Sequence, residues 1–421
     1  MNQRESRYLN KKIRAGALQY VVALSLLIFF LMGLFMLRAH YSNLHVNEVL
    51  ISQRLSDHLS SAKLLIKHEP SLLNQVGKKE LEILDGKVSL KTEHWGVFDL
   101  VQLETSYRHQ HKEEIFMLGD NTQIEGRPSL YLTDKRRYLS VCGDTWIGGP
   151  VYLPALGVRR SYVDGVGYYR EKLIQGEIRN SDSKLPQVRS KYLERFEEMW
   201  KLDTDRDSIV GWEEINTGEL KRSFKEKSLV IHSVDEIHLQ NMSLKGKIKL
   251  ISDKAIVIDE TSQVEQCILI APKVVCGTGS QLNCQIYARN YVEIGADSRI
   301  KYPSIVMMNG PNPQKELIIR DSTWFNGEIV VLGKQEKKAP VVKLKPNTKM
   351  LGMLYCEGTV ELEGDVAGSV YTNRFLLKTR SALYENHLLN NRVDVADLDE
   401  NYAGIAWINE EREKEILEYL W

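Results

Sequence analysis

The chain has 421 residues, of which 43% are hydrophobic, and its 56 basic side chains balance its 56 acidic ones. This length suits two or three domains with hydrophobic cores, and the balanced charge argues against nucleic acid as a partner. Five cysteines without a C-x-x-C pair disfavour a zinc site, and their odd number argues against a fully disulfide-bonded fold. They are Cys142, Cys267, Cys276, Cys284 and Cys356.

The amino terminus predicts a membrane anchor. Residues 1–16 form a basic head, and residues 17–37 follow without a charged side chain. As a helix this apolar run spans about 30 Å, the thickness of a bilayer core. A cleaved secretory signal is the competing interpretation, but its apolar region would be shorter and RAHYSNLHV after Leu37 offers no small-residue cleavage site. The positive-inside rule places the head in the cytoplasm and the chain after Arg38 outside it, which predicts a single-pass inner-membrane protein with a periplasmic or extracytoplasmic bulk.

The apolar run is expected to continue as an amphipathic stalk, giving one helix over residues 17–67. Apolar residues recur along one face at helical spacing, and the first proline is Pro70. The stalk either packs on its own domain or forms the spine of an assembling subunit. The stripe consists of Leu44, Ile51, Leu55, Leu59, Ala62 and Ile66.

A basic leader ending in Gly16, followed by RAGALQYVVALSLL and an amphipathic half-helix, resembles the amino terminus of type IV pilins and type II secretion pseudopilins, especially the minor, K-type and PilX-like members. The resemblance covers residues 11 to about 67. It implies cleavage after Gly16 and bundling of the apolar helix in a filament. Two positions depart from the pattern, because Ala17 replaces the first phenylalanine and Val21 stands where the family has glutamate.

The region between the stalk and the later repeats reads as β structure and then helix. Alternating apolar residues and turn glycines predict a β-rich neck domain over residues 86–183. A helical insertion or connector is expected over 184–227, because LPQVRSKYLERFEEMWKL carries a helical stripe. A tail with a final capping helix, INEEREKEILEYLW, is expected over 386–421.

Four copies of one pattern follow each other at steps of 17 to 19 residues, superposed on Ser233, Ser252, Ala271 and Ala288. Each copy has two apolar runs separated by a small residue and two polar or turn residues. This step suits one coil of a β-solenoid whose strands stack in parallel register about 4.8 Å apart. We therefore expect a mainly β fold with a β-helix of about eight coils over residues 228–385. Tight corners are expected at Gly246, Gly327, Gly352 and Gly368.

The serial glycine-apolar coils resemble bactofilins, the polymer-forming cytoskeletal β-helices. The segment from LIAPKVVCG to YPSIVMM is also similar to uncharacterised envelope proteins that join such a helix to a pilin-like amino terminus. This resemblance implies a fold and a location, offers self-association by coil stacking, and brings no activity.

One motif points to a metal. In DTDRDSIVGWEE, Asp203, Asp205, Asp207 and Glu214 occupy positions 1, 3, 5 and 12 of an EF-hand-type loop, which is the oxygen-ligand spacing of a Ca²⁺ site. The usual turn glycine is replaced by Ser208, which disfavours the sharp loop. The competing interpretation is a solvated acidic connector. No other cofactor is expected.

Cys267 and Cys284 are equivalent in neighbouring coils, so a disulfide is geometrically allowed, but two buried thiols are the favoured interpretation. No catalytic motif is present. The sequence therefore predicts a structural envelope protein, a minor pilin-like or scaffold component whose partners are the membrane and other envelope proteins or pilin-like subunits. The alternative is a membrane-tethered carbohydrate-active β-helix enzyme using carboxylates such as Glu361, Glu363 and Asp365.

Overall fold

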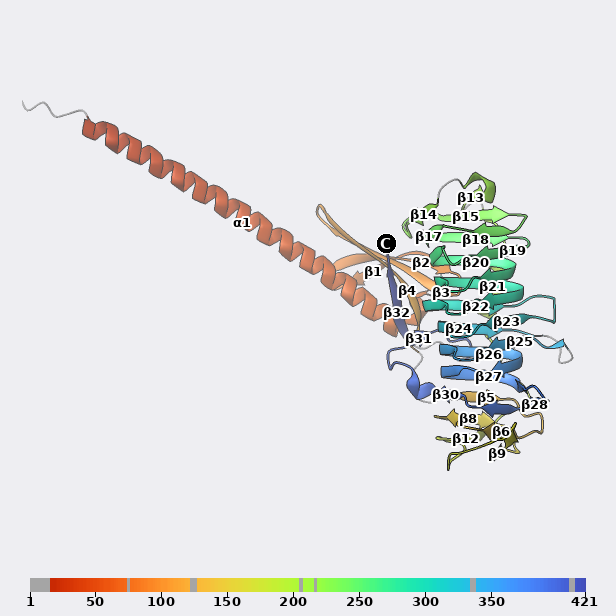
Figure 1. Ribbon diagram of the computed structural model, residues 1–421. Coiled ribbons are helices and arrows are strands. Elements are labelled where there is room, and N and C mark those ends of the chain that lie inside the picture. The colour runs from red at the N-terminus through yellow and green to blue at the C-terminus, as the bar shows by residue number, and fades with distance from the viewer. Residues whose placement is uncertain are drawn as a thin grey trace, which may run out of the picture.

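A long helix projects from the side of a β-rich rod, and a small antiparallel sheet joins the two (Figure 1). The computed structural model describes residues 16–73, 76–121, 127–203, 207–215, 218–333, 338–408 and 413–421. The prediction of a mainly β chain with a long amino-terminal helix is confirmed. Apart from Gly16, the predicted basic head lies outside the described residues.

The helix, α1 (Gly16–His68), is unbroken over 53 residues, as the absence of proline before Pro70 predicts. It is long and apolar enough to cross a membrane. Its amino-terminal half is exposed, whereas Leu59, Ala62 and Ile66 are buried because they pack on the antiparallel sheet. The predicted stripe therefore packs on the protein's own domain only from about Leu55 onward, and Leu44 stays 45% exposed.

That sheet, here called the stalk sheet, is an antiparallel meander with two added strands from the carboxyl terminus. The short helix η1 (Pro70–Leu73) leads from α1 into it. The meander strands are β1 (Gly77–Ile83), β2 (Gly86–Trp95), β3 (Phe98–Tyr107) and β4 (Gln110–Asn121), and the added strands on β4 are β31 (Ala403–Gly404) and β32 (Lys414–Leu420).

The prediction of a carboxyl-terminal capping helix was wrong. Residues 414–420 form β32, which pairs antiparallel with β4 and covers its open edge. In this strand the side chain of Ile416 joins the core beneath α1, while Leu417 and Leu420 pack toward the rod. Backbone pairing with an open edge, together with burial on both faces, outweighs the helical propensity of this segment.

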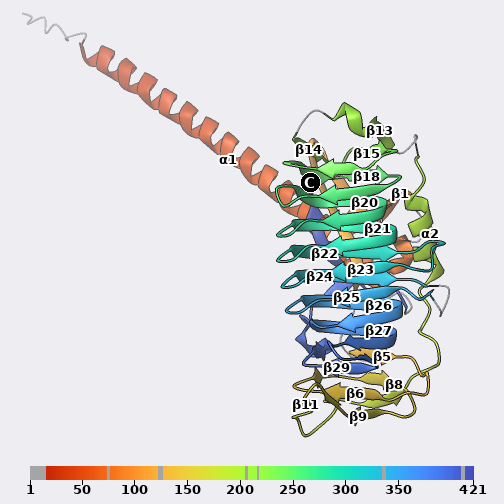
Figure 2. The same ribbon diagram turned by 45° about the vertical axis from the view of Figure 1, so that its right-hand side comes forward.

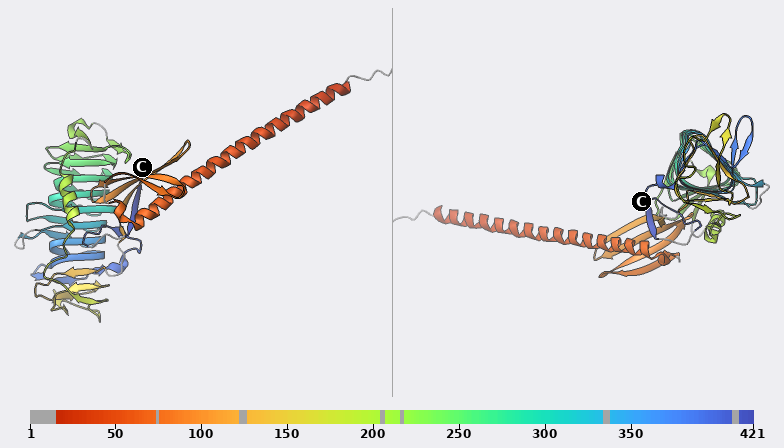
Figure 3. Two further views of the ribbon diagram at one scale, coloured as in Figure 1. Left: turned by 180° about the vertical axis from the view of Figure 1, so that it is seen from behind. Right: turned by 90° about the horizontal axis from the view of Figure 1, so that it is seen from below.

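The rod is a stack of parallel coils with a three-sided outline when viewed along its length (Figure 3). Its main strands follow the chain. They are β13 (Asp207–Gly211), β14 (Glu219–Arg222), β15 (Ser228–Ser233), β16 (Ile237–Leu239), β17 (Ser243–Gly246), β18 (Ile248–Ser252), β19 (Ala255–Ile258), β20 (Gln263–Cys276), β21 (Gln281–Ile294), β22 (Arg299–Met308), β23 (Glu316–Ile319), β24 (Trp324–Val331), β25 (Val341–Leu344), β26 (Lys349–Leu362) and β27 (Asp365–Lys378). The helix η2 (Trp212–Glu214) follows β13.

The predicted repeat corresponds to the coils. Ser233 pairs with Ser252, and Ala271 pairs with Ala288, in parallel register. One column of interior side chains runs through the whole rod, because equivalent residues of successive coils stack on each other. The column contains Ile231, Leu250, Leu269, Ile286, Val306, Ile329, Leu354, Val370, Leu130 and Val151.

The corner glycines are explained by contact between neighbouring coils. Gly327, Gly352 and Gly368 pair in one column, and all three have positive φ. A Cβ added to Gly352 would lie 2.0 Å from the carbonyl oxygen of Gly327. A side chain is therefore excluded both by the backbone conformation and by the coil beneath.

The predicted neck over 86–183 is divided in the structure. Its first part forms the stalk sheet, whereas residues from Leu130 onward build further coils at the end of the rod, where β5 (Leu130–Leu132) pairs with β27. The rod therefore extends beyond the predicted 228–385 at both ends. Its remaining elements are β6 (Leu139–Cys142), β7 (Trp146–Ile147), β8 (Val151–Leu153), β9 (Val158–Arg160), β10 (Tyr162–Val163), β11 (Val166–Gly167), β12 (Ile178–Asn180), β28 (Leu383–Glu385), β29 (His387–Leu389), β30 (Arg392–Asp394) and η4 (Val395–Asp397).

From β12 the chain returns along the outside of the rod to its opposite end, passing through α2 (Ser190–Met199) (Figure 2). The predicted helix within 184–227 is confirmed, although it is shorter than the sequence pattern suggests. Tyr192 and Phe196 are buried against the rod, and Phe196 packs on Tyr287 with ring centroids 5.9 Å apart. The helix thus fastens the returning segment to the coils.

Candidate functional site

The turn between β2 and β3 docks the stalk sheet on the middle of the rod. The backbone N–H of Val97 donates to the Tyr287 hydroxyl at 2.8 Å and to Gln285 Oε1 at 3.1 Å. The indole N–H of Trp95 donates to the Gln266 carbonyl at 3.0 Å. These buried bonds fix where the rod sits relative to α1.

A buried ionic network strengthens the same joint. Arg195 of α2 donates to Asp99 Oδ1 at 2.8 Å, and the Lys414 ammonium of β32 lies 3.1 Å from Asp99 Oδ2 and 3.0 Å from Asp120 Oδ1. Burial opposes ionisation of Asp99, but the bond with His94 and the charges of Arg195 and Lys414 outweigh it and hold the pKa of Asp99 well below its usual range. Three segments far apart in the chain are therefore tied at one carboxylate.

A polar cavity of about 390 Å³ opens beside this network. It lies between the base of the stalk, the stalk sheet and α2, and its walls carry charges of both signs. The basic groups facing it include Lys191 and Arg195, and the acidic groups include Glu194 and Glu198. Sequence reasoning missed this site because its walls come from segments that only the tertiary fold brings together.

A second buried carboxylate lies where the carboxyl-terminal segment crosses the rod. Glu328 Oε2 accepts from the backbone N–H of Ile405 at 3.0 Å and from the Trp407 indole N–H at 2.6 Å. Burial raises the pKa of Glu328 to about 7, although Arg127 and the two hydrogen bonds oppose the shift. The pattern of apolar and polar residues in β24 does not predict that Glu328 is buried, because the residues that cover it come from a distant part of the chain.

In the part of the chain that the structure describes, the acidic residues of the predicted calcium loop make separate contacts and do not converge on one point. Asp207 begins β13, accepts a bond from the Ser228 hydroxyl and lies 3.1 Å from the Lys249 ammonium. Glu214 accepts from the backbone N–H of Gly211 at 3.2 Å. Asp203 lies just before the strand, its carbonyl accepting from the Asp207 N–H, and Asp205 lies outside the described residues.

Within the described ranges, no group of three or more His, Cys, Asp or Glu side chains is arranged to hold a metal ion. A lysine ammonium against Asp207 also supplies the positive charge that a cation would otherwise provide. Because Asp205 is not described, the Ca²⁺ site stays a prediction that these contacts do not favour.

The five cysteines are free and buried. Cys267 pairs in register with Cys284, as predicted, and both side chains belong to the interior of the rod. Burial raises the pKa of the Cys276 thiol to about 12 and raises those of Cys267 and Cys284 as well. These thiols therefore act as apolar core residues.

The carboxylates considered for a carbohydrate-active enzyme lie along the flank of the rod. Glu363 forms an ion pair of 2.7 Å with Lys345. Glu361 lies opposite Lys343 in the strand register, and the ammonium of Lys343 contacts Glu316 at 2.7 Å. Asp365 accepts from the backbone N–H of Arg392 at 2.9 Å. Their arrangement is that of a charged outer face stabilised by cross-strand pairs.

The distal end of the rod, formed by β9 to β12, carries large exposed side chains. Tyr162 and Tyr169 are 68% and 71% exposed, and Ile178 in the terminal strand β12 is 50% exposed. Strand β12 pairs only with β8 among the described strands, so its other edge faces outward. Guanidinium groups lie on two aromatic rings here, Arg159 over Tyr138 and Arg170 over Trp146.

Comparisons with protein-family models, with curated proteins and with solved structures found no significant match for this chain.

Proposed function

We propose that this protein is a single-pass structural component of the cell envelope, which holds a β-solenoid rod at a fixed place above a membrane and presents it to other proteins. The resemblance of the amino terminus to pilins extends this proposal. On that interpretation the exposed part of α1 also packs against equivalent helices in a filament or secretion assembly. The bulk of the chain lies on the periplasmic side of the inner membrane.

The observation that carries the proposal is that the two ends of α1 have different surroundings. Residues 17–37 are apolar, exposed and of bilayer length, whereas Leu59, Ala62 and Ile66 near the carboxyl end of the helix are buried against the stalk sheet. One rigid helix thus joins the span to the sheet, and the sheet is in turn bonded to the rod through Val97 and Tyr287. Such a connection suits a protein that holds the rod at a fixed distance from the membrane.

Exposed apolar residues beyond the charge-free run favour helix packing between copies. Val46, Val49 and Leu50 are 51%, 51% and 57% exposed although they follow Arg38. A stalk that worked alone in the periplasm would leave these side chains in water. The distal end of the rod, with Tyr162 and Tyr169, is the surface offered to a further protein, since exposed tyrosines and arginines are enriched at binding sites.

Cysteine cross-linking in membranes tests the assembly. The native cysteines are buried, so a cysteine placed at Leu50 is the reactive thiol of the described chain. If copies pack through the stalk, Leu50→Cys gives a disulfide-linked dimer on mild oxidation, whereas Ser60→Cys, an exposed position beside the stalk sheet, does not. Equal dimer formation at both positions, or at neither, contradicts stalk packing. Sequencing the mature amino terminus then separates a processed pilin-like chain beginning at Ala17 from an anchor that keeps Met1.

The enzyme alternative is disfavoured, because the flank carboxylates Glu363 and Asp365 are engaged by neighbouring groups.

A further inference from the structure

We propose that the tip of the β3–β4 hairpin and the face of α1 beside it form a binding surface for anionic phospholipid headgroups. Residues 104–112 of the hairpin and residues 38–48 of α1 make up this surface, here called the collar. The inference rests on the part of the proposed function in which α1 spans a membrane, and it is independent of whether copies assemble.

The hairpin runs along α1 toward the membrane. Going from the sheet to the tip, Glu114 contacts Lys63 at 2.8 Å, the Lys112 ammonium donates to the Ser52 carbonyl at 3.2 Å, and the Gln110 amide donates to the Glu48 carbonyl at 3.3 Å. Each step along the strand thus reaches a helix residue nearer to the charge-free run. The turn residues Arg108 and His109 lie beyond the last of these contacts.

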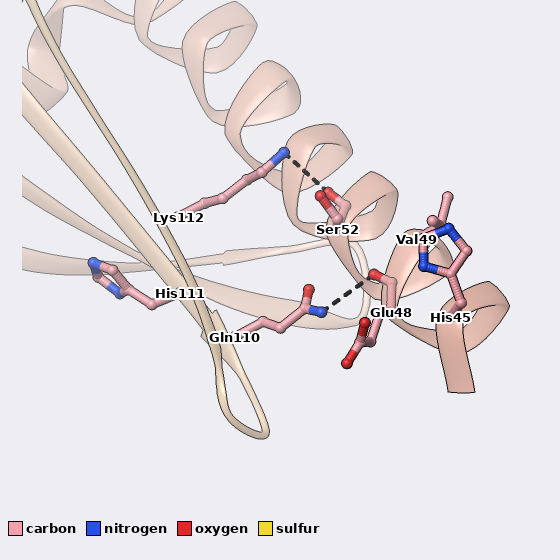
Figure 4. A pocket seen from close by; sticks show the side chains of 7 residues that line it. All are labelled: His45, Glu48, Val49, Ser52, Gln110, His111 and Lys112. Carbon is pink, nitrogen blue, oxygen red and sulfur yellow. Dashed lines mark hydrogen bonds between the residues drawn. The ribbon is translucent and has the colours of Figure 1, made fainter. Parts of the chain in front are cut away.

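The tip and the stalk enclose a cavity of about 420 Å³ that is open toward solvent (Figure 4). His45, Glu48 and Val49 line it from α1, and Gln110, His111 and Lys112 line it from the hairpin. The side chains of His45 and His111 are exposed. The collar is therefore a hydrated surface and not part of the protein core.

The collar stands close to where lipid headgroups would lie. His45 is eight residues beyond Leu37, the last residue of the charge-free run, which corresponds to about 12 Å along a helix. The headgroup layer occupies about 5 to 8 Å on each side of the hydrocarbon core. The remaining gap is within a Debye length of about 8 Å, so charges on the collar act on lipid phosphates.

The collar has a positive net charge and contains four histidines. Its basic groups are Arg38, Arg108 and Lys112, its histidines are His40, His45, His109 and His111, and its acidic groups are Glu48 and Glu104. With neutral histidines the basic groups exceed the acidic ones by one, and with four protonated histidines the excess is five. Histidine is the side chain that ordinarily changes charge between pH 5 and 8.

Two tyrosines occupy the same level. Tyr41 on α1 is 62% exposed, and Tyr107 at the end of β3 is 40% exposed with the Arg108 guanidinium over its ring at 5.4 Å. Tyrosine is enriched at membrane interfaces because its ring prefers the headgroup level. A guanidinium over such a ring still has N–H groups that can donate to phosphate oxygens.

The test uses the full-length protein reconstituted in phosphatidylcholine bilayers with a trace of spin-labelled phosphatidylglycerol or spin-labelled phosphatidylcholine. The immobilised fraction of each label gives the selectivity of the protein for the anionic lipid. We expect this selectivity to rise by about threefold or more between pH of about 7.5 and about 5.5, because each added positive charge near the surface attracts anionic lipid. The basic head before Gly16 contains no histidine, so its contribution stays constant over this range.

Arg108→Glu is expected to lower the selectivity at both pH values, and His109→Ala with His111→Ala to remove much of its rise on acidification. Lys254→Glu makes the same charge change as Arg108→Glu on the rod, between β18 and β19, where the side chain is 61% exposed, and should leave the selectivity unchanged. Equal selectivity of wild type and Arg108→Glu, or an equal loss in Lys254→Glu, overturns the proposal. If α1 does not span a membrane, neither label shows immobilised lipid. That outcome contradicts the proposed membrane anchor and is distinct from a loss of lipid selectivity.

Discussion

Glu328 accepts a 2.6 Å hydrogen bond from the indole N–H of Trp407, and this bond joins the middle of the rod to the segment that leads into the last strand of the stalk sheet. The carboxylate is fully buried, and burial raises its pKa to about 7. A group placed in this way makes the attachment of the carboxyl-terminal segment depend on pH.

The first prediction concerns that dependence. The folded-state pKa of Glu328 lies above the ordinary glutamate value. Its contribution to the free energy of unfolding is therefore most favourable at low pH and is lost as pH rises from about 4.5 to about 7. Glu328→Gln keeps an acceptor for Trp407 without a titrating proton, so it should stabilise the protein above neutral pH by up to about 3 kcal/mol. Thermal unfolding of the detergent-solubilised chain between acidic and alkaline pH measures the effect. Glu260→Gln, at an exposed position, should leave the profile unchanged.

A second prediction addresses the glycine corners. Gly352→Ala places a Cβ 2.0 Å from the Gly327 carbonyl oxygen at a φ of +129°, and should destabilise the rod by about 2 kcal/mol or more. Gly279→Ala provides the control, since its φ is +76° but no atom lies within 4 Å of the added Cβ. Its expected cost is only about 1 kcal/mol, from backbone conformation alone. Equal losses in the two variants would show that coil contact is not the constraint.

The third prediction tests the ionic joint. Lys414→Met leaves Asp120 without its buried cation and leaves Asp99 with Arg195 as its remaining cation, which should destabilise the attachment of β32 by about 3 kcal/mol. Hydrogen exchange of residues 414–420 should accelerate, while exchange in the interior coils around Leu269 stays slow. Lys414→Arg retains the charge and should keep most of the protection. If β32 exchanges slowly in Lys414→Met, the network is not what holds the strand.

A fourth prediction follows from the buried thiols. Native protein should react with iodoacetamide far more slowly than denatured protein at Cys142, Cys267, Cys276, Cys284 and Cys356, because all five are buried and burial raises the thiol pKa of each. Mass spectrometry of the alkylated peptides reads each site separately. Rapid alkylation of Cys267 or Cys284 in the native rod would mean that the coils around them open.

The coils were the most predictable part of the fold because the repeated residue pattern is present in each coil. Ser233, Ser252, Ala271 and Ala288 repeat at a step that only stacked strands satisfy, and the pairing of Ser233 with Ser252 follows directly. The long helix was equally clear, because apolar periodicity and the absence of proline are local properties. Residue pattern alone was sufficient wherever a segment packs on its neighbours in sequence.

The elements that were predicted wrongly depend on distant partners. Strand β32 has helical propensity and becomes a strand only because β4 presents an unpaired edge. The Asp99 network could not be foreseen, since Lys414 comes from the opposite end of the chain, 315 residues from Asp99. The acidic loop shows the converse case: its spacing suggested calcium, but Lys249 from a later coil lies against Asp207.

The position of β5 on β27 has a consequence for how the protein is made. Leu130 stacks on Val370, and nearby the Thr133 hydroxyl donates to the Asn373 carbonyl across 240 residues of sequence. A ribosome therefore releases the distal coils long before the surface on which they rest has been synthesised. Those coils must wait without their partner β27 while most of the chain emerges, so completion of the rod is a late event that any truncation before about residue 378 would abolish.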